Sequence, residues 1–318
     1  MADLRRRPLL AALPGLTLMS APAGAQSPPL KLGTATPGGG FPVYGAAFIK
    51  AIKAVDPAFE IEEVNTKGST ENVPLLEAGK LDLALVQGEV VQDVFFGAGR
   101  PPSTLKVVTA MYASPGMFVV RADSPYRRIA DLKGKPVAWG ARGSGLVILG
   151  RYVVDGVGFD AEKDFEPVYL ERAGDGPAMV LDGKVAALWG GGARWPGFVA
   201  VAKAPGGARF LVPDAGEIDR ILAKYGFLKR ITVPAGNFPG QTAAMPTVGS
   251  WSFVLARPGL DEAVGYRLAS ALHKVERAGA PSEQLSETTA KNTLDALPIP
   301  GALQSGVARY DKEIGLLR

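Results

Sequence analysis

The sequence contains no cysteine and only one histidine in 318 residues. Without cysteine the chain has no disulfide bond, no thiol nucleophile, no thiolate metal site and no lipid-carrying cysteine. The single histidine, His273, lies in the amphipathic stretch from Tyr266 to Arg277, close to Leu268 and Leu272. That setting favours a structural or surface role over a catalytic one. We therefore predict no catalytic residue, no metal site and no cofactor.

Long apolar runs are also scarce, and the main one lies near the start of the sequence. It extends from Leu9 to Met19, follows three arginines at 5–7, and precedes the small residues Ala23-Gly24-Ala25. The run is about half of the ~20 residues that a membrane-spanning helix needs. This order is typical of a secretory signal peptide, which we predict to cover residues 1–25 and to be cleaved after Ala25. We expect the mature protein in the periplasm, and the arginines leave twin-arginine export open as an alternative route.

Signatures of nucleotide and nucleic-acid binding are missing as well. The formal net charge is +4 and the basic residues are scattered, which argues against nucleic acid as a partner. The stretch Gly33 to Gly38 lacks the Gly-x-Gly-x-x-Gly spacing, and no phosphate-binding P-loop sequence occurs. Gly143-Ser144-Gly145 lacks the spacing of a hydrolase nucleophile elbow. Of the carboxylates considered for acid–base chemistry, Asp82 and Glu89 fit surface or capping roles better.

What the sequence does have is a regular alternation of strand and helix patterns, which predicts an α/β fold with a mostly parallel sheet. We predict two lobes around a hinge and a ligand cleft: a discontinuous lobe of residues 30–120 plus 248–318, and a lobe of residues 121–247. The expected strands are Leu30–Thr34, Glu60–Val64, Leu81–Gln87, Val107–Ala110, Met117–Arg121, Pro136–Trp139, Val168–Leu170, Ala186–Trp189 and Thr247–Ala256, and the expected helices include Val43–Val55, Ser69–Ala78, Leu146–Val154, Asp261–Arg277 and Ser282–Leu294.

Two glycine-rich loops stand where a strand gives way to a helix. The first is Thr36-Pro37-Gly38-Gly39-Gly40 and the second is Arg142-Gly143-Ser144-Gly145. Backbone amides at a helix N-terminus attract anions, and glycine lets a ligand approach closely. One loop in each lobe predicts a shared cleft for a carboxylate, with Arg142 as a bidentate partner. The alternatives are that both loops are plain tight turns and that Arg142 is a solvated side chain.

Polar and aromatic residues complete the predicted site. Thr36, Ser69, Asn72 and Gln87 lie at strand ends or helix starts that face one edge of the sheet. Ser69 and Asn72 have helix capping as an alternative role, and the aromatic candidates have the hydrophobic core. The predicted ligand-binding residues are Thr36, Gly38, Gly39, Gly40, Phe41, Tyr44, Ser69, Asn72, Gln87, Tyr112, Arg142, Gly143, Ser144, Gly145 and Trp189, and Trp139 is a further aromatic candidate.

Several segments, in order along the chain, resemble one known family. They include Thr66-Lys67-Gly68-Ser69-Thr70-Glu71-Asn72, the run from Leu75 to Gln87, Ala130–Lys135, Pro246–Gly249 and Leu294–Pro300. The sequence is similar there to solute receptors of the TAXI subfamily of tripartite ATP-independent periplasmic (TRAP) transporters. The resemblance implies a type II periplasmic binding fold, delivery of a small solute to a membrane-embedded TRAP permease, and ligands such as glutamate, glutamine or 2-oxoacids.

The sequence departs from this family at the expected pocket. Gly40-Phe41-Pro42-Val43-Tyr44 replaces the usual Thr-Tyr-Tyr-Pro, proline is missing near Arg142, and the strand at Ala187–Trp189 runs into Gly190-Gly191-Gly192-Ala193-Arg194-Trp195. We expect a receptor for an amino acid, dicarboxylate or 2-oxoacid. Two alternatives are an enzyme on the same scaffold, such as a dehydratase or deaminase, and a binding protein that serves a sensor kinase or another transporter. Porphobilinogen deaminase is excluded, because its cofactor needs a cysteine.

Overall fold

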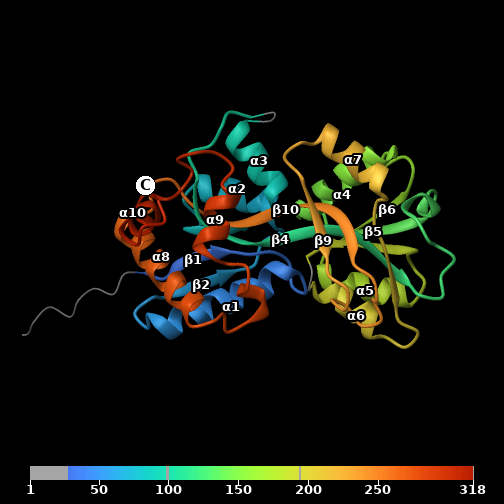
Figure 1. Ribbon diagram of the computed structural model, residues 1–318, viewed down its shortest axis with the longest axis horizontal. Helices are drawn as coiled ribbons and strands as arrows, with labels where there is room; N and C mark the ends of the chain where they lie inside the picture. The colour runs from blue at the N-terminus through green and yellow to red at the C-terminus, as the bar shows by residue number, and fades with distance from the viewer. Residues whose placement is uncertain (1–27, 98–99, 193–194, 318) are drawn as a thin grey trace, which may run out of the picture.

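The computed structural model describes residues 28–97, 100–192 and 195–317. The predicted signal peptide and its cleavage site, together with Ala193 and Arg194, lie outside these ranges. Figure 1 shows two α/β lobes side by side, with long strands running from one to the other. None of the helices in the described ranges has the length and apolar composition that crossing a bilayer requires.

The first lobe is built from a parallel sheet of three strands with helices packed on it. Strand β1 lies in the centre, with β2 on one side and β3 on the other. All four side chains of β3 are buried, as expected for a strand covered on both faces. The elements are β1 (Leu30–Gly33), α1 (Gly40–Val55), β2 (Ile61–Val64), α2 (Ser69–Glu77), β3 (Leu83–Val86), α3 (Gly88–Phe96) and, from the end of the chain, α8 (Glu262–Arg277), η3 (Glu283–Leu285), α9 (Ala290–Ala296) and α10 (Ser305–Glu313).

The second lobe repeats the same layout. Its parallel strands are β7, β5 and β6 in that order, and β8 and β9 add antiparallel partners. The elements are η1 (Ile129–Leu132), β5 (Pro136–Ala141), α4 (Gly145–Val157), β6 (Glu166–Leu170), η2 (Ala173–Asp175), α5 (Gly176–Leu181), β7 (Ala187–Gly191), α6 (Pro196–Lys203), β8 (Ala208–Leu211), α7 (Ala215–Lys224) and β9 (Lys229–Val233).

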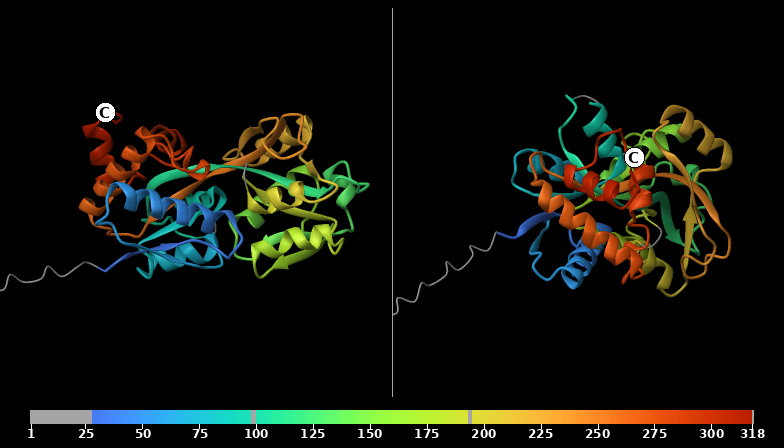
Figure 2. Two further views of the ribbon diagram at one scale, coloured as in Figure 1. Left: turned by 90° about the horizontal axis from the view of Figure 1, so that it is seen from below. Right: turned by 60° about the vertical axis from the view of Figure 1, so that its left-hand side comes forward.

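Two long strands join the lobes, as both views in Figure 2 show. Strand β4 (Lys106–Arg121) pairs first with β10 and then with β7 and β8. Strand β10 (Met245–Ala256) pairs with β9 at its start and with β3 at its end, antiparallel to both. The prediction of a mostly parallel sheet is therefore wrong for these crossing strands, although it holds within each lobe.

The predicted break between two strands at residues 110–117 is also wrong, because β4 is continuous. Pro115 falls where β4 leaves β10 for its second-lobe partners, and a missing N–H is tolerated at such a change of partner. Gly116 is required there, since a Cβ would lie 2.6 Å from the Trp189 ring. The helix expected at 282–294 is divided, because Thr289 Oγ1 accepts a hydrogen bond from Asn292 N at 3.0 Å and starts a new helix.

The hydrophobic core divides along the same line as the sheet. One cluster of buried residues draws on residues 32–111 and 253–307, and includes Phe48 and Leu85. Two further clusters fall within residues 117–248, on the two faces of the second-lobe sheet, and include Trp139 and Phe198. Each lobe therefore buries its own apolar side chains, and the crossing strands carry the connection between them.

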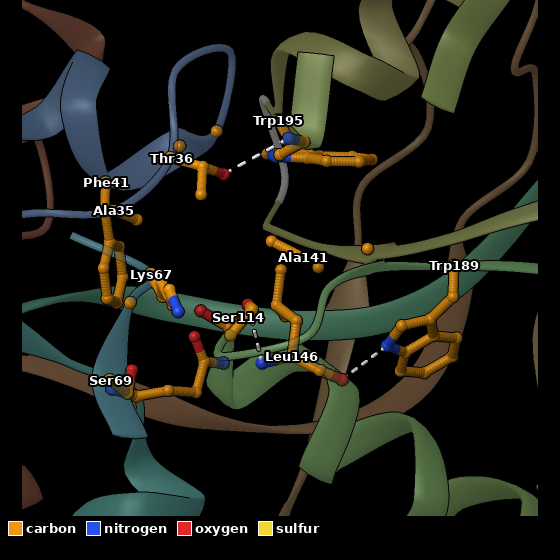
Figure 3. Close-up of a pocket in the computed structure, with 18 of the residues that line it drawn as sticks. Ala35, Thr36, Phe41, Lys67, Ser69, Ser114, Ala141, Leu146, Trp189 and Trp195 are labelled. Carbon is orange, nitrogen blue, oxygen red and sulfur yellow. Dashed lines mark hydrogen bonds between the residues drawn. The ribbon is translucent and has the colours of Figure 1, made fainter. Parts of the chain in front are cut away.

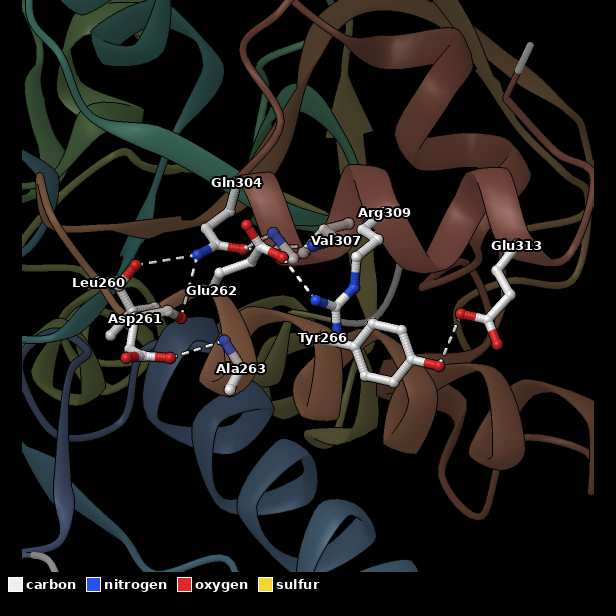
Figure 4. Close-up of polar contacts among 10 residues, drawn as sticks. Leu260, Asp261, Glu262, Ala263, Tyr266, Gln304, Val307, Arg309 and Glu313 are labelled. Atoms are coloured by element: carbon white, nitrogen blue, oxygen red, sulfur yellow. Dashed lines mark hydrogen bonds and ion pairs between the residues drawn. The ribbon is translucent and has the colours of Figure 1, made fainter.

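The C-terminal helices are fixed to the first lobe by one buried glutamine (Figure 4). Gln304 Oε1 accepts from the amides of Gly306 at 2.6 Å and Val307 at 3.2 Å, which caps α10. Its Nε2 donates to the carbonyls of Leu260 at 3.0 Å and Asp261 at 3.2 Å, just before α8. One side chain thus satisfies four backbone groups at the contact of two helices.

Replacing Gln304 with alanine should therefore destabilise the protein. The change leaves buried backbone groups unpaired and removes a helix cap, so we expect a loss of about 2–4 kcal/mol in the free energy of unfolding, measured by urea denaturation. Gln92→Ala is the control, because Gln92 makes no side-chain hydrogen bond within the described ranges. Equal stability of the two variants would contradict the anchoring role.

Candidate functional site

A cavity lies between the two lobes, beside the crossing strand β4 (Figure 3). Its empty volume is about 610 Å³, counted with its opening to solvent. It is lined by Ala35, Thr36, Gly39, Gly40, Phe41, Lys67, Gly68, Ser69, Gln87, Tyr112 and Ser114 from the first lobe and β4, and by Trp139, Gly140, Ala141, Ser144, Leu146, Ala173, Trp189, Gly191 and Trp195 from the second lobe.

Five helices begin at this cavity. The residues that precede their first turns are Gly39 for α1, Gly68 for α2, Gln87 for α3, Ser144 for α4 and Trp195 for α6, and every one of them lines the cavity. Each helix N-terminus carries about half a positive charge and several amides without intrahelical partners. The carboxyl ends of parallel strands meet at this edge of each sheet, which is why the helix starts gather here.

Lys67 adds a full positive charge. It is the only Lys, Arg, Asp or Glu among the described residues that line the cavity. Its side chain is exposed, and no ion pair holds its ammonium group within the described ranges. Figure 3 shows the side chain reaching from the first-lobe wall into the space between the walls. The electrostatics of the cavity are therefore positive and are not balanced by a carboxylate in its lining.

A chain of hydroxyl groups orients Gln87. Ser252 Oγ donates its one proton to Gln87 Oε1 at 3.3 Å. In the 3.3 Å hydrogen bond between Ser114 Oγ and Ser252 Oγ, Ser114 is therefore the donor. Gln87 N donates to Ser69 Oγ at 3.0 Å, which leaves the Ser69 proton free to be donated. Two buried donors, Gln87 Nε2 and Trp139 Nε1, have no partner in hydrogen-bonding geometry. Such groups cost free energy until something accepts from them.

The two tyrosines beside the cavity are neutral donors. Burial raises the pKa of Tyr112 well above its ordinary value, with the Glu287 carboxylate acting in the same direction. Burial likewise raises the pKa of Tyr44, whose hydroxyl bonds to Thr288 Oγ1 at 3.0 Å. Tyr44 meets the Tyr112 ring edge-on at 5.7 Å between centroids. Tyr44 therefore supports Tyr112 from the core, while Tyr112 faces the cavity.

A profile of the NMT1-like family matches residues 32–315. The chain belongs to the NMT1-like family. Its structure is similar to that of a protein from Bordetella bronchiseptica RB50, with 13% identity, a TM-score of 0.53, and coverage of 90% of this chain and 82% of that chain. It is also similar to the alkanesulfonate-binding protein SsuA from Xanthomonas axonopodis pv. citri (20% identity, TM-score 0.49, 90% of each chain) and to a TctC solute-binding protein from Polaromonas (18% identity, TM-score 0.46, 84% of this chain and 89% of that chain).

The fold class predicted for this NMT1-like protein is confirmed: it is α/β, with the two lobes and interlobe cleft of the type II periplasmic binding fold. The structure brings nine of the predicted ligand-binding residues to the cavity wall. They are Thr36, Gly39, Gly40, Phe41, Ser69, Gln87, Tyr112, Ser144 and Trp189. Both glycine-rich loops therefore contribute to one crevice.

The other six predicted residues of the NMT1-like chain are placed elsewhere. Asn72 is fully buried, and its amide donates to the carbonyls of Thr34 and Leu85 at 2.8 Å each, which ties α2 to two strands. Arg142 is exposed and stacks on the Tyr169 ring at 4.1 Å from the centroid. Tyr44 packs in the core, as described above. Gly38, Gly143 and Gly145 lie at close contacts between the lobes.

Residue types alone did not point to several lining residues of the NMT1-like site. Lys67 had a usable signal, since it stands two residues before Ser69 in a segment already expected at the cleft. Ala173 and Trp195 follow the strands β6 and β7, so the rule that ligands bind at the carboxyl ends of strands points to them as well. Ala141 and Leu146 carry no chemical signal in the sequence.

Glycines hold the two lobes of this NMT1-like protein in contact. Gly143 O accepts from Thr70 N at 3.2 Å and Thr70 Oγ1 at 3.0 Å across the cleft. On the other side of the cavity, Gly174 N donates to Pro37 O at 3.3 Å. A Cβ on Gly143 would lie 2.8 Å from Lys67 Cβ and Lys67 O. The contact therefore has no room for any larger residue.

Replacing Gly143 with alanine should hold this NMT1-like protein open. The added methyl group meets backbone across the cleft, so closure is penalised and the open form gains population. We expect a larger radius of gyration by small-angle X-ray scattering of protein purified with its own bound solute. Gly226→Ala is the control, because its nearest neighbour would be Leu222 O at 3.9 Å. Identical scattering from both variants would show that this contact does not control closure.

A buried carboxyl group next to the NMT1-like site should make stability depend on pH. Glu89 is fully buried and accepts from Ser250 Oγ at 2.7 Å. Burial raises the pKa of Glu89 to about 7, against the opposing effect of its hydrogen bond from Ser250. Glutamate in an unfolded chain titrates near a pKa of about 4.3, so between these values the native state binds more protons and stability falls as pH rises.

Glu89→Gln should remove this fall in folding stability with rising pH. We expect the stability advantage of the variant over wild type to grow by about 3 kcal/mol between pH 4 and pH 8, measured by urea denaturation at each pH. Asp311 titrates in both proteins, because burial raises its pKa to about 6, and it therefore cancels in the comparison. Parallel curves for the two proteins would contradict the assignment of the effect to Glu89.

Proposed function

We propose that this NMT1-like protein is an exported receptor that binds a small organic anion between its lobes and passes it on without converting it. The observation that carries the proposal is the convergence of five helix N-termini and Lys67 on one cavity, to whose wall the described part of the chain contributes no carboxylate. Each helix N-terminus stabilises a nearby anion by roughly 0.3–1 kcal/mol. A charge-assisted hydrogen bond stabilises the anion by roughly 1.5–3 kcal/mol. Together these contributions support micromolar binding, which corresponds to about 8 kcal/mol.

The proposed binding cycle uses the two lobes that the sequence predicts. The first lobe is residues 30–120 with 248–318, and the second lobe is residues 121–247. An anion first meets Lys67 and the amides of Gly40 and Phe41 on the first lobe. The second lobe then closes on it with Ser144 and the tryptophans. Only contacts that exist solely in the closed form drive closure, so residues of both lobes contribute to affinity.

The resemblance of the sequence to TAXI receptors supports a finer proposal. After cleavage following Ala25, the mature protein acts in the periplasm and delivers its solute to a membrane-embedded TRAP permease. The solute bears a carboxylate, and 2-oxoacids, amino acids and dicarboxylates are the classes to test. Unchanged solute recovered after prolonged incubation with the protein supports a receptor, whereas a converted product supports the alternative, an enzyme on this scaffold.

Lys67→Met should weaken binding of an organic anion without unfolding the protein. The side chain is exposed and its loss removes the one full charge among the described lining residues, so we expect the dissociation constant to rise about 10- to 100-fold, measured by isothermal titration calorimetry. The ligand is the solute that co-purifies, identified by mass spectrometry and added back after it has been removed.

Lys80→Met provides the matched control, because it removes the same charge from an exposed position of the same lobe outside the cavity. We expect it to bind like wild type. An equal weakening in both variants would assign the effect to net charge. No weakening in either would overturn the proposed anion site.

A further inference from the structure

The polar groups of the cavity are gathered on one wall. The first lobe and β4 supply the side chains of Thr36, Lys67, Ser69, Gln87, Tyr112 and Ser114. The second lobe supplies mainly apolar surface, from Trp139, Ala141, Leu146, Ala173, Trp189 and Trp195. Figure 3 shows this division: Lys67 and Ser69 stand on one side, and Ala141, Leu146 and Trp189 face them from the other.

The few polar groups of the second wall are largely used within that lobe. Trp189 Nε1 donates to Leu146 O at 2.7 Å, and Ser144 Oγ accepts from Leu146 N at 3.2 Å. Trp139 Nε1 is the exception, since it is buried without a partner. The second wall therefore offers a solute mainly apolar surface, together with the starts of α4 and α6 and a few hydrogen-bond donors, and none of its lining residues in the described ranges carries a full charge.

The lining also lacks what an amino acid needs. An α-ammonium group buried in the closed cavity requires an acceptor, preferably a carboxylate, because an unpaired buried charge is very costly. No Asp or Glu belongs to the lining formed by residues 28–97, 100–192 and 195–317. The acids beside the lining are already engaged: Glu71 accepts from the Lys67 amide and Glu89 accepts from Ser250. Glu287, which lines an adjoining hollow with Glu283, accepts from the Ala113 amide at 2.8 Å.

The lining lacks a partner for a second carboxylate as well. Lys67 is the single cation of the described lining, and it stands on the first wall with the start of α2. Arg142, the other basic residue expected at the cleft, is exposed and stacked on Tyr169. A dicarboxylate that fills the cavity would place one of its charged groups against the mainly apolar second wall, where no cation of the described lining pairs with it and only the starts of α4 and α6 offset the lost hydration.

We infer that the solute is a monoanionic organic acid with an apolar body and no amino group, an inference that rests on the proposed function. Its acid group binds the first lobe, between Lys67 and the N-termini of α1 and α2. Its apolar body lies against Leu146 and the tryptophans of the second lobe. This assignment separates the site from one built for glutamate, glutamine or a dicarboxylate.

The test uses pairs of ligands that share one carbon skeleton. Calorimetry on the purified mature protein compares phenylpyruvate with phenylalanine, 4-methyl-2-oxopentanoate with leucine, and hexanoate with adipate. We expect the monoanion of each pair to bind at least tenfold more tightly than its partner. We also expect pyruvate, which keeps the acid and lacks the apolar body, to bind at least tenfold more weakly than phenylpyruvate.

A variant of the second wall checks the orientation. Leu146→Asn has nearly the same shape and is polar, and we expect it to weaken phenylpyruvate about tenfold while pyruvate changes less than twofold. Lys67→Met should weaken both acids by the same factor. A general loss of structure in Leu146→Asn would instead weaken both acids and lower the melting temperature, which is why pyruvate serves as the internal control.

The outcomes separate the inference from the proposed function. Tighter binding of phenylalanine, leucine or adipate than of the matched monoanion, with sensitivity to Lys67→Met, keeps an anion receptor and overturns the monoanion assignment. Equal affinity within each pair also overturns it. Absence of binding by every acid of the panel, together with a co-purified solute that is not an anion, overturns the proposed function itself.

Discussion

The structure depends on one electrostatic arrangement: several helices begin at a cavity whose described lining residues include no balancing carboxylate. Helix starts are normally satisfied by capping side chains or by water. Here α1, α2 and α3 have no side-chain cap, and the cavity lies between closed lobes. Closing the lobes removes water from these amides, so closure is favourable only when an acceptor takes its place. An anionic ligand and the closed form thus stabilise each other.

Glycine determines how closely the lobes approach. Gly145 fits against Gln87, where a Cβ would come within 2.3 Å of the Gln87 Cβ, and Gly38 fits against Gly174 in the same way. These residues were expected to bind a ligand through their amides, yet in the structure their small size serves the contact between lobes. The glycine-rich loops therefore both line the cavity and form contacts between the lobes: Gly39 and Gly40 face the cavity, while Gly38 faces the other lobe. The sequence pattern alone does not show which glycine has which role.

Much of the fold was accessible from the sequence because it follows local patterns. The apolar strands and the turns into helices repeat along the chain, and they correctly indicated an α/β fold with two lobes and a shared crevice. The continuity of β4 was not accessible, because Pro115 and Gly116 have the composition of a turn. Only the pairing with β10 on one side and with β7 and β8 on the other keeps the strand extended through them.

The site was predictable to the extent that position along a strand or helix fixes where a residue lies. Ser69 and Gln87 were found because they stand at a helix start and a strand end. Asn72 belongs to the same helix start, but its amide turns to carbonyl groups of two strands, a choice that depends on which strands lie beneath α2. Trp195 lies beyond the end of β7, so the strand order places it at this edge of the sheet, but its residue type does not show that the side chain lines the cavity.

The division of the cavity into a charged wall and an apolar wall also gives the two lobes different roles in time. In an open molecule the field of Lys67 and the first-lobe helix starts extends into water, and it draws an anion to that lobe before closure. The apolar wall contributes only when it covers the ligand, because burial of apolar surface acts at contact distance. Capture therefore depends on the first lobe, and retention depends on the second. A solute without an apolar body would be captured by this protein and then released before closure.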